Sequence, residues 1–132
     1  MSRWPLFVLF LLASLAGRSQ EAEKDRVVEA ISSGDPGSLS ELFIPNLDLT
    51  VNGTGDVYSK AQAEQILRKF FDEHPPVDLV IEHSGVSKFG DKYFIGILRT
   101  RTGYFRVTFF LKKMEQGFLV KQLRIEDSKS DF

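Results

Sequence analysis

From Val77 to Ile125, apolar and polar residues alternate with a period of two, and this pattern constrains the fold more than any other feature. Residues that alternate in this way point to opposite faces of a β-sheet. The alternation breaks at three short stretches, which are Gly90-Asp91, Thr102-Gly103 and residues 113–117. Strands joined by such short turns run antiparallel. The C-terminal half is therefore predicted to form four antiparallel strands.

The residues before the sheet predict two helices and a strand. Apolar residues spaced three and four apart favour a helix over residues 21–33. Asp35 followed by Pro36 is typical of the start of a second, short helix, which we expect to end at Pro45-Asn46. Alternating residues 47–51 then favour a short strand, followed by a turn over residues 52–56.

A longer helix is predicted immediately before the sheet. Ser59 and Gln62 have the spacing of a capping box, and an apolar stripe extends from Ala63 to Phe71. His74, followed by two prolines, is expected at the C-terminal end of this helix. The fold class is therefore α+β: two N-terminal helices, a short strand, a long capped helix, and a curved four-stranded antiparallel sheet that wraps this helix in a cone.

Two tight turns assign the two faces of the sheet. If Gly90-Asp91 is a two-residue turn, Gly85 lies opposite Gly96, and this pair would allow a sharp bend. The concave face is then predicted to carry Leu79, Ile81, His83, Phe94, Leu98, Thr100, Phe105, Val107, Phe109 and Leu111. The last strand has two possible registers. Either Leu119, Leu123 and Ile125 face inward, or Val120, Gln122 and Arg124 do.

The opposite face of the sheet mixes apolar and charged residues. Glu82, Arg99 and Arg106 are predicted to share one cross-strand row, with Glu126 or Asp127 as a further member. This row is either an anion site of paired arginines or a salt-bridge ladder on an outer face or dimer seam.

Composition excludes several classes of site. The 132 residues carry 17 basic and 18 acidic side chains, without the basic stretch that a nucleic-acid-binding protein uses to contact phosphates. Cysteine is absent, so disulfides, thiolate metal sites and a cysteine nucleophile are excluded. Two distant histidines without carboxylates at ligand spacing predict no metal site, and nothing predicts a cofactor.

The N-terminus has the layout of a secretory signal peptide. Arg3 precedes an apolar stretch from Leu6 to Leu12, which is too short to span a membrane. Cleavage is expected after Ala16, with Gly17 or Ser19 as later alternatives. We therefore expect a secreted or periplasmic protein without a membrane partner, in which residues 21–127 form one domain and residues 128–132 a flexible tail.

The chain resembles the nuclear-transport-factor-two-like superfamily of cone-shaped α+β domains. The order of its elements carries the resemblance, as do the phrases at residues 33–35, 57–64, 103–107, 110–113 and 122–126. Within this superfamily it looks like a small exported bacterial family of unknown function. The resemblance implies a pocket inside the cone and a homodimer formed through the outer sheet face. Tyr93, Ile95, Ile97 and Phe110 would suit that interface.

The predicted inner face suggests a site for a small apolar ligand. Its lining would comprise Tyr58, Phe70, His83, Leu98, Thr100, Phe105, Phe109 and Gln122. His83 is a weak catalytic candidate, since an inward imidazole among apolar neighbours has a depressed pKa, but a lone inward histidine is also common as a structural residue. The same phenylalanines would instead fill the core if the cone is closed.

Three functions follow from these alternatives. The first is an exported, non-catalytic domain that binds a small apolar ligand or a protein partner as a homodimer. The second is an isomerase-like or cyclase-like enzyme that uses His83. The third is a structural accessory protein with a filled cone. The superfamily includes both enzymes and binding modules, so the fold alone does not choose between these functions.

Overall fold

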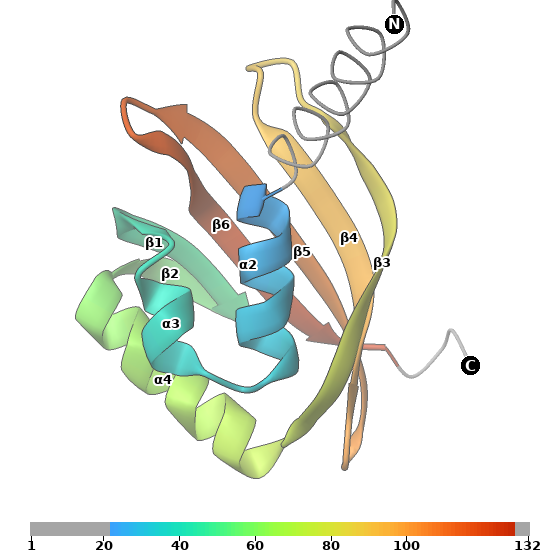
Figure 1. Cartoon of the computed structure of the whole chain (residues 1–132). Coiled ribbons are helices and arrows are strands. Elements are labelled where there is room, and N and C mark those ends of the chain that lie inside the picture. Colours follow the sequence, from blue (N-terminus) through green and yellow to red (C-terminus); the bar gives the residue numbers. More distant parts are fainter. Residues whose placement is uncertain (1–21, 129–132) are drawn as a thin grey trace, which may run out of the picture.

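A computed structural model of the chain describes residues 22–128, which form a curved, unclosed sheet with helices on one face (Figure 1). The sheet has six strands in the order β2-β1-β6-β5-β4-β3, and all neighbours are antiparallel except β1 and β6. In chain order the elements are α2 (Ala22–Ser32), α3 (Pro36–Ser40), β1 (Phe43–Val51), β2 (Thr54–Ser59), α4 (Lys60–Glu73), β3 (Pro76–Val86), β4 (Lys92–Thr100), β5 (Gly103–Met114) and β6 (Gly117–Asp127).

The α+β class and the curved sheet beside the helices are confirmed, but the predicted number of strands is wrong. Residues Asn52 and Gly53 alone form the turn after β1, and both adopt positive φ angles of 49° and 85°. The chain therefore returns at once as β2, which pairs with β1 along its whole length. Because most side chains of this edge strand are exposed, it lacks the apolar alternation that reveals a half-buried strand.

Strand β1 begins earlier than predicted and includes Pro45. Its parallel register with β6 is interrupted between Phe43 and Asp48, so the proline lies at an irregularity where the ladder is already broken. Leu47 and Leu49 are buried and Asp48 is exposed, as the alternation predicted.

The helix starts match their sequence signals. At α4, the Ser59 hydroxyl accepts a hydrogen bond from the Gln62 amide, while the Gln62 side chain accepts one from the Ser59 amide at 3.1 Å. At α3, the Asp35 carboxylate accepts bonds from the Ser38 amide at 3.1 Å and the Ser38 hydroxyl at 2.7 Å. These bonds lower the pKa of Asp35, because they stabilise its charged form.

The turns of the sheet differ from the prediction, with different consequences. Thr100 pairs with Gly103, so the turn after β4 consists of Arg101 and Thr102. This shift leaves the faces of β4 and β5 as predicted, and Phe105 and Phe109 are buried. The connection after β3, by contrast, spans residues 87–91. Gly85 therefore lies opposite Tyr93 rather than the glycine predicted.

In β6, one irregularity in the pairing makes each of the two predicted registers correct for only part of the strand. Pairing with β5 shifts between Phe110 and Leu111, which leaves Lys121 without a direct partner in the ladder. As a result Val120 and Leu123 are both buried, although they belonged to different alternatives, while Gln122 lies opposite Phe110 on the outer face.

The space between the helices and the sheet is filled by a continuous apolar core. Phe109 is fully buried, and its ring stacks on that of Phe94 with centroids 5.1 Å apart. The other large core side chains include Phe43, Leu47, Leu49, Leu67, Phe70, Phe71, Leu98, Phe105, Val107, Leu123 and Ile125. The depth of the cone is therefore packed.

The described residues test the predicted C-terminal boundary of the domain but not the N-terminal one. The predicted signal peptide lies outside the described residues, as do residues 129–132. The prediction that the flexible tail begins at Ser128 is wrong, because Ser128 is buried and its amide donates to the Tyr104 carbonyl at 3.1 Å. Among helices of the described residues, none has the length and apolar character required to cross a membrane.

Candidate functional site

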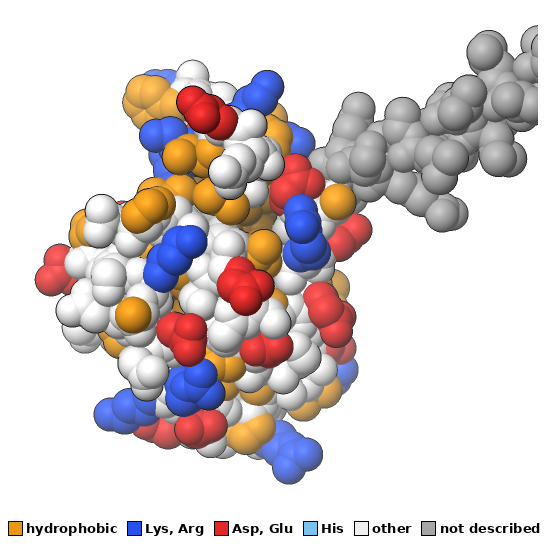
Figure 2. Space-filling model, turned by 60° about the vertical axis from the view of Figure 1, so that its left-hand side comes forward, with side chains coloured by type: hydrophobic (Ala, Val, Ile, Leu, Met, Phe, Trp, Pro, Cys, Tyr) orange, Lys and Arg blue, Asp and Glu red, His pale blue; other side chains and the backbone are white. Residues whose placement is uncertain are grey.

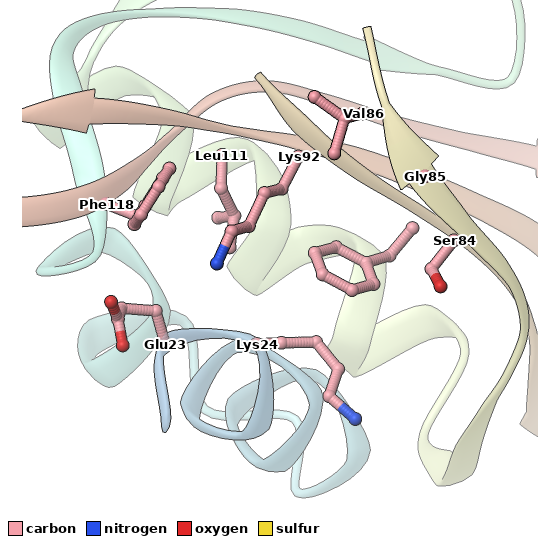
Figure 3. Close-up of a pocket in the computed structure, with 9 residues that line it drawn as sticks. Glu23, Lys24, Ser84, Gly85, Val86, Lys92, Leu111 and Phe118 are labelled. Carbon is pink, nitrogen blue, oxygen red and sulfur yellow. The ribbon is translucent and has the colours of Figure 1, made fainter. Parts of the chain in front are cut away.

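A hollow of about 240 Å³ opens between the start of α2 and the sheet. It lies at the end of the sheet that carries the β3–β4 and β5–β6 turns, which we call the wide end, or mouth, of the cone. It is lined by side chains from α2, β3, β4, β5 and β6 (Figure 3). The lining residues are Glu23, Lys24, Ser84, Gly85, Val86, Lys92, Phe94, Leu111 and Phe118. The hollow therefore lies where the packed core ends and the sheet continues beyond it.

The apolar part of this hollow is fixed by the core. Phe94 rests on the buried ring of Phe109, and Leu111 is itself almost completely buried. Phe118 is half-buried and packs against the core from β6. Because the core packs against these side chains on the side away from the hollow, they form a preformed apolar surface.

Lys24, Lys92 and the carboxylate of Glu23 line the hollow beside this apolar surface. The ammonium group of Lys92 lies 4.4 Å from the centroid of the Phe118 ring, which is within the range of a cation–π contact. Lys24, on α2, lies 3.2 Å from the carboxylate of Asp25. In Figure 3, Lys92 projects from the sheet toward the helix that carries Glu23 and Lys24. The hollow thus combines an apolar surface with charged side chains of both signs.

The predicted aromatic lining does not surround this hollow. Phe70 and Phe105 are buried, with ring centroids 5.0 Å apart in an edge-to-face contact, and they lie in the core beside Leu98 and Phe109. His74, at the end of α4 as predicted, lies against both rings, and its Nδ1 is 2.5 Å from the Thr102 hydroxyl. These side chains close the narrow end of the cone.

The predicted polar members of the lining also lie elsewhere. Thr100 donates from its hydroxyl to the Gly103 carbonyl at 2.8 Å and so stabilises the turn after β4. Tyr58 is half-buried and packs against the core from β2. Gln122 is on the outer face, so the prediction that it points into the cone is wrong.

The prediction that His83 points inward is also wrong. Pairing between β3 and β4 shifts between Ile81 and His83, so Ile81 lies opposite Gly96 and His83 lies opposite Ile95. This irregularity turns His83 to the outer face, where its side chain is exposed. Its imidazole therefore lacks the apolar surroundings on which the catalytic hypothesis depended.

The predicted charge row has a different carboxylate. Arg99 donates from Nε and one terminal nitrogen to Asp78, at 2.7 and 2.8 Å, so Asp78 takes the role predicted for Glu82. Arg106 lies opposite Ile97 and Glu126 rather than Arg99. The two arginines are therefore not paired as a single anion site, and the Asp78–Arg99 pair is a salt bridge on the outer face.

The Asp78–Arg99 pair predicts a specific dependence of stability on pH. The guanidinium of Arg99 lowers the pKa of Asp78 below its ordinary value of 3.8. The pair therefore stabilises the fold above that value, and the stabilisation is lost as the pH falls through the lowered pKa. Asp78→Asn should reduce the urea midpoint more at pH 7 than at pH 2. An equal reduction at both pH values would contradict this origin of the stabilisation.

The lysines of the hollow were missed by the sequence reasoning, although one signal was available. Lys92 has the same alternation as Phe94 and Leu98, which were correctly placed on the inner face. The irregularity in β3, which turns Val86 to the inner face opposite Lys92, was not anticipated. Within residues 22–128, no three His, Cys, Asp or Glu side chains gather as metal ligands.

The arrangement of the helices and the curved sheet defines the fold class of the protein. The chain has the nuclear-transport-factor-two-like, or cystatin-like, α+β fold. A Rhodospirillum rubrum protein, described as an NTF2-like protein of unknown function in nutrient uptake, shares this fold with a TM-score of 0.60 at 16% identity, over 80% of this chain and 95% of its own.

The family is defined more closely by sequence. The DUF4783 family, a domain of unknown function, matches residues 24–126, and the chain belongs to this family. Crystal structures of its members from Bacteroides uniformis and Bacteroides ovatus are similar, at 27% and 28% identity and a TM-score of 0.73 for both. The matches cover 79% and 78% of this chain and 95% and 93% of theirs. No curated protein matches the chain.

Proposed function

We propose that this chain is a non-catalytic binding domain that holds a small amphipathic ligand, with an apolar body and an anionic group, in the hollow at the wide end of the cone. The supporting observation is the combination of a preformed apolar surface with two lysines in a hollow of about 240 Å³. A volume near the lower limit of small-molecule sites favours a ligand of modest size.

The chemistry of the lining favours an amphipathic ligand over a purely apolar one. Phe94, Leu111 and Phe118 offer contact to an aliphatic or aromatic body. Lys24 and Lys92 would attract a carboxylate or sulfonate at the rim, and Glu23 restricts where that anionic group can lie. The proposal thus retains the small ligand predicted from sequence but moves its site from the depth of the cone to its mouth.

The other two functions have less support. An isomerase or cyclase would require an acid or base beside bound substrate, and the exposed His83 is not among the lining residues. A structural accessory protein agrees with the packed depth of the cone, but it does not account for the hollow at the mouth.

Filling the hollow should strongly weaken binding of an amphipathic anion. Ser84→Phe adds a ring at the lining without removing core contacts, since Ser84 is exposed. We expect it to weaken binding of 8-anilinonaphthalene-1-sulfonate at least tenfold, measured by fluorescence titration. Lys92→Gln should weaken binding about fivefold, as expected when one charge contact worth roughly 1 kcal/mol is lost.

The matched control for this experiment is Glu82→Phe, which adds the same ring to β3 outside the hollow. It should bind the probe as the unmodified protein does. Equal affinity of the unmodified protein and the Ser84→Phe variant would place binding elsewhere and overturn the proposal.

We also propose that two copies associate through the outer face of the sheet. The three described helices all lie on the other face (Figure 1), and half-buried Tyr93, Ile95, Ile97 and Phe110 occupy the uncovered side. Exposed Val80 on β3, opposite Ile97, and exposed Tyr104 on β5, opposite Arg99, extend this surface. Such a surface is typical of an interface between subunits.

A charge at the centre of this face should prevent association. Ile97→Asp is expected to convert a dimer to a monomer, because it would replace an apolar contact with a charged side chain that loses hydration in the interface. Size-exclusion chromatography with light scattering gives the mass of each species. A monomeric unmodified protein at high concentration would contradict the dimer.

A further inference from the structure

The most exposed aromatic side chain in the described part of the chain is Phe89, at 86%. It lies in the connection between β3 and β4, residues 87–91. This connection is held by ordered hydrogen bonds: the Ser87 amide donates to the Asp91 carbonyl at 2.8 Å, and the Gly90 amide donates to the Ser87 carbonyl at 3.0 Å. The loop therefore presents a large apolar ring to solvent from a defined turn.

The carboxylate of Asp91 anchors this loop to the sheet. Asp91 is 5% exposed and forms an ion pair with Lys121 of β6. Because both charges of this pair are satisfied internally, neither contributes much to the net charge of the surface around Phe89. The charge of that surface is set by the other side chains.

Lysines dominate the end of the molecule at which Phe89 lies. We define the two tip loops as residues 87–92 and 112–117, which comprise the turns of the β3–β4 and β5–β6 hairpins and the adjoining strand ends. They contain Lys88, Lys92, Lys112 and Lys113, against Glu115 as the acidic residue that remains besides Asp91. Met114, at 36% exposure, adds a second apolar side chain.

Both tip loops lie at the same end of the sheet. Figure 1 shows the β3–β4 and β5–β6 hairpins reaching the upper end of the molecule, above the start of α2. In the space-filling view, the uppermost lobe carries hydrophobic and basic side chains with an acidic one between them (Figure 2). Hydrophobic side chains also reach the surface in the constriction below this lobe.

We propose that the two tip loops dock the protein on an anionic lipid surface, with Phe89 inserted at the headgroup level and the lysines against lipid phosphates. An exposed aromatic residue flanked by lysines suits the boundary between headgroups and acyl chains. Each lysine near an anionic membrane adds to the attraction, which falls away within a Debye length. An acidic protein partner would use the lysines but would require a pocket for Phe89.

This inference goes beyond the proposed ligand site, although Lys92 and the mouth of the hollow lie at the same end of the sheet. The sequence predicted no membrane partner, because no segment after the N-terminus is long and apolar enough to span a bilayer. Docking by loop tips requires no span, so the absence of such a segment does not oppose it. A cone that faces a lipid surface would also face a source of amphipathic anions.

Vesicle flotation tests this inference without any ligand. The unmodified protein should float with phosphatidylcholine vesicles that contain roughly one-third phosphatidylglycerol and should stay in solution with phosphatidylcholine alone. Phe89→Ser should lower the partition coefficient about tenfold, and Lys88→Gln combined with Lys113→Gln about 25-fold. Added salt should weaken the binding.

The control is Lys60→Gln combined with Lys69→Gln, which removes the same charge from the exposed surface of α4. It should float as the unmodified protein does. The inference is overturned if the unmodified protein fails to float, if this control weakens binding as strongly as the tip variants, or if Phe89→Ser has no effect. Equal binding to polyglutamate would instead assign the lysines to an acidic protein. Probe binding by the hollow, measured without vesicles, stands or fails separately.

Discussion

Phe109→Ala is expected to lower the free energy of unfolding by about 3–5 kcal/mol. Phe109 is fully buried in the middle of β5, it stacks on Phe94, and its strand partner on β6 is buried Leu123. The truncation would leave a cavity that the rigid sheet and the helices in front of it cannot close. Urea unfolding at constant m-value measures the loss.

The neighbouring residue Phe110 supplies a matched control. It lies on the outer face of the same strand and is half-buried. Phe110→Ala should cost far less stability in the monomer, about 1 kcal/mol, because little apolar area is removed from an enclosed space. A small loss for Phe109→Ala would mean that the depth of the cone is open, and the ligand site would then belong there.

Gly96→Ala is expected to cost about 2–4 kcal/mol or to prevent folding. A Cβ at this position would lie 3.0 Å from the Cα of Ile81 and would clash with the Val80 carbonyl oxygen. Both contacts are with backbone of β3, at the place where its pairing with β4 becomes irregular. The side chain cannot be accommodated unless the two strands separate.

Gly37→Ala is the control for this substitution. Gly37 lies in α3, and an added Cβ would meet only the Asp35 carboxylate at 3.6 Å, which is ordinary contact. Alanine should be neutral or slightly stabilising there, since it favours helix and restricts the unfolded chain. If both variants had the same small effect on the thermal midpoint, the close approach of β3 and β4 at Gly96 would be contradicted.

The sequence predicted the faces of most strands because alternation depends only on parity. The turn after β4 was predicted one residue too far along the chain, yet Leu98, Phe105 and Phe109 point inward as predicted. Helix starts were predicted because the Ser59 and Asp35 side chains bond to amides only three residues away. Local chemistry of this kind is visible in a single sequence.

The site was not predicted, because two irregularities in the sheet reverse the parity on which the prediction depended. A shift in β3 turned His83 outward and Val86 toward the hollow. A second shift, in β6, placed Gln122 on the outer face. The residues at these two irregularities, Glu82 and Lys121, are neither glycine nor proline, so the sequence does not indicate a bulge there. The proposed ligand site consequently moved from the depth of the cone to its mouth.

Chemical-shift mapping by NMR tests the location of the ligand site most directly. Amide resonances of the ¹⁵N-labelled protein are followed during titration with 8-anilinonaphthalene-1-sulfonate. We expect saturable changes at Val86, Phe94 and Phe118, around the mouth of the cone, and unchanged resonances at Phe70 and Phe105. Saturable changes centred on Phe70 and Phe105 would contradict a packed cone whose only ligand contacts are made at its rim.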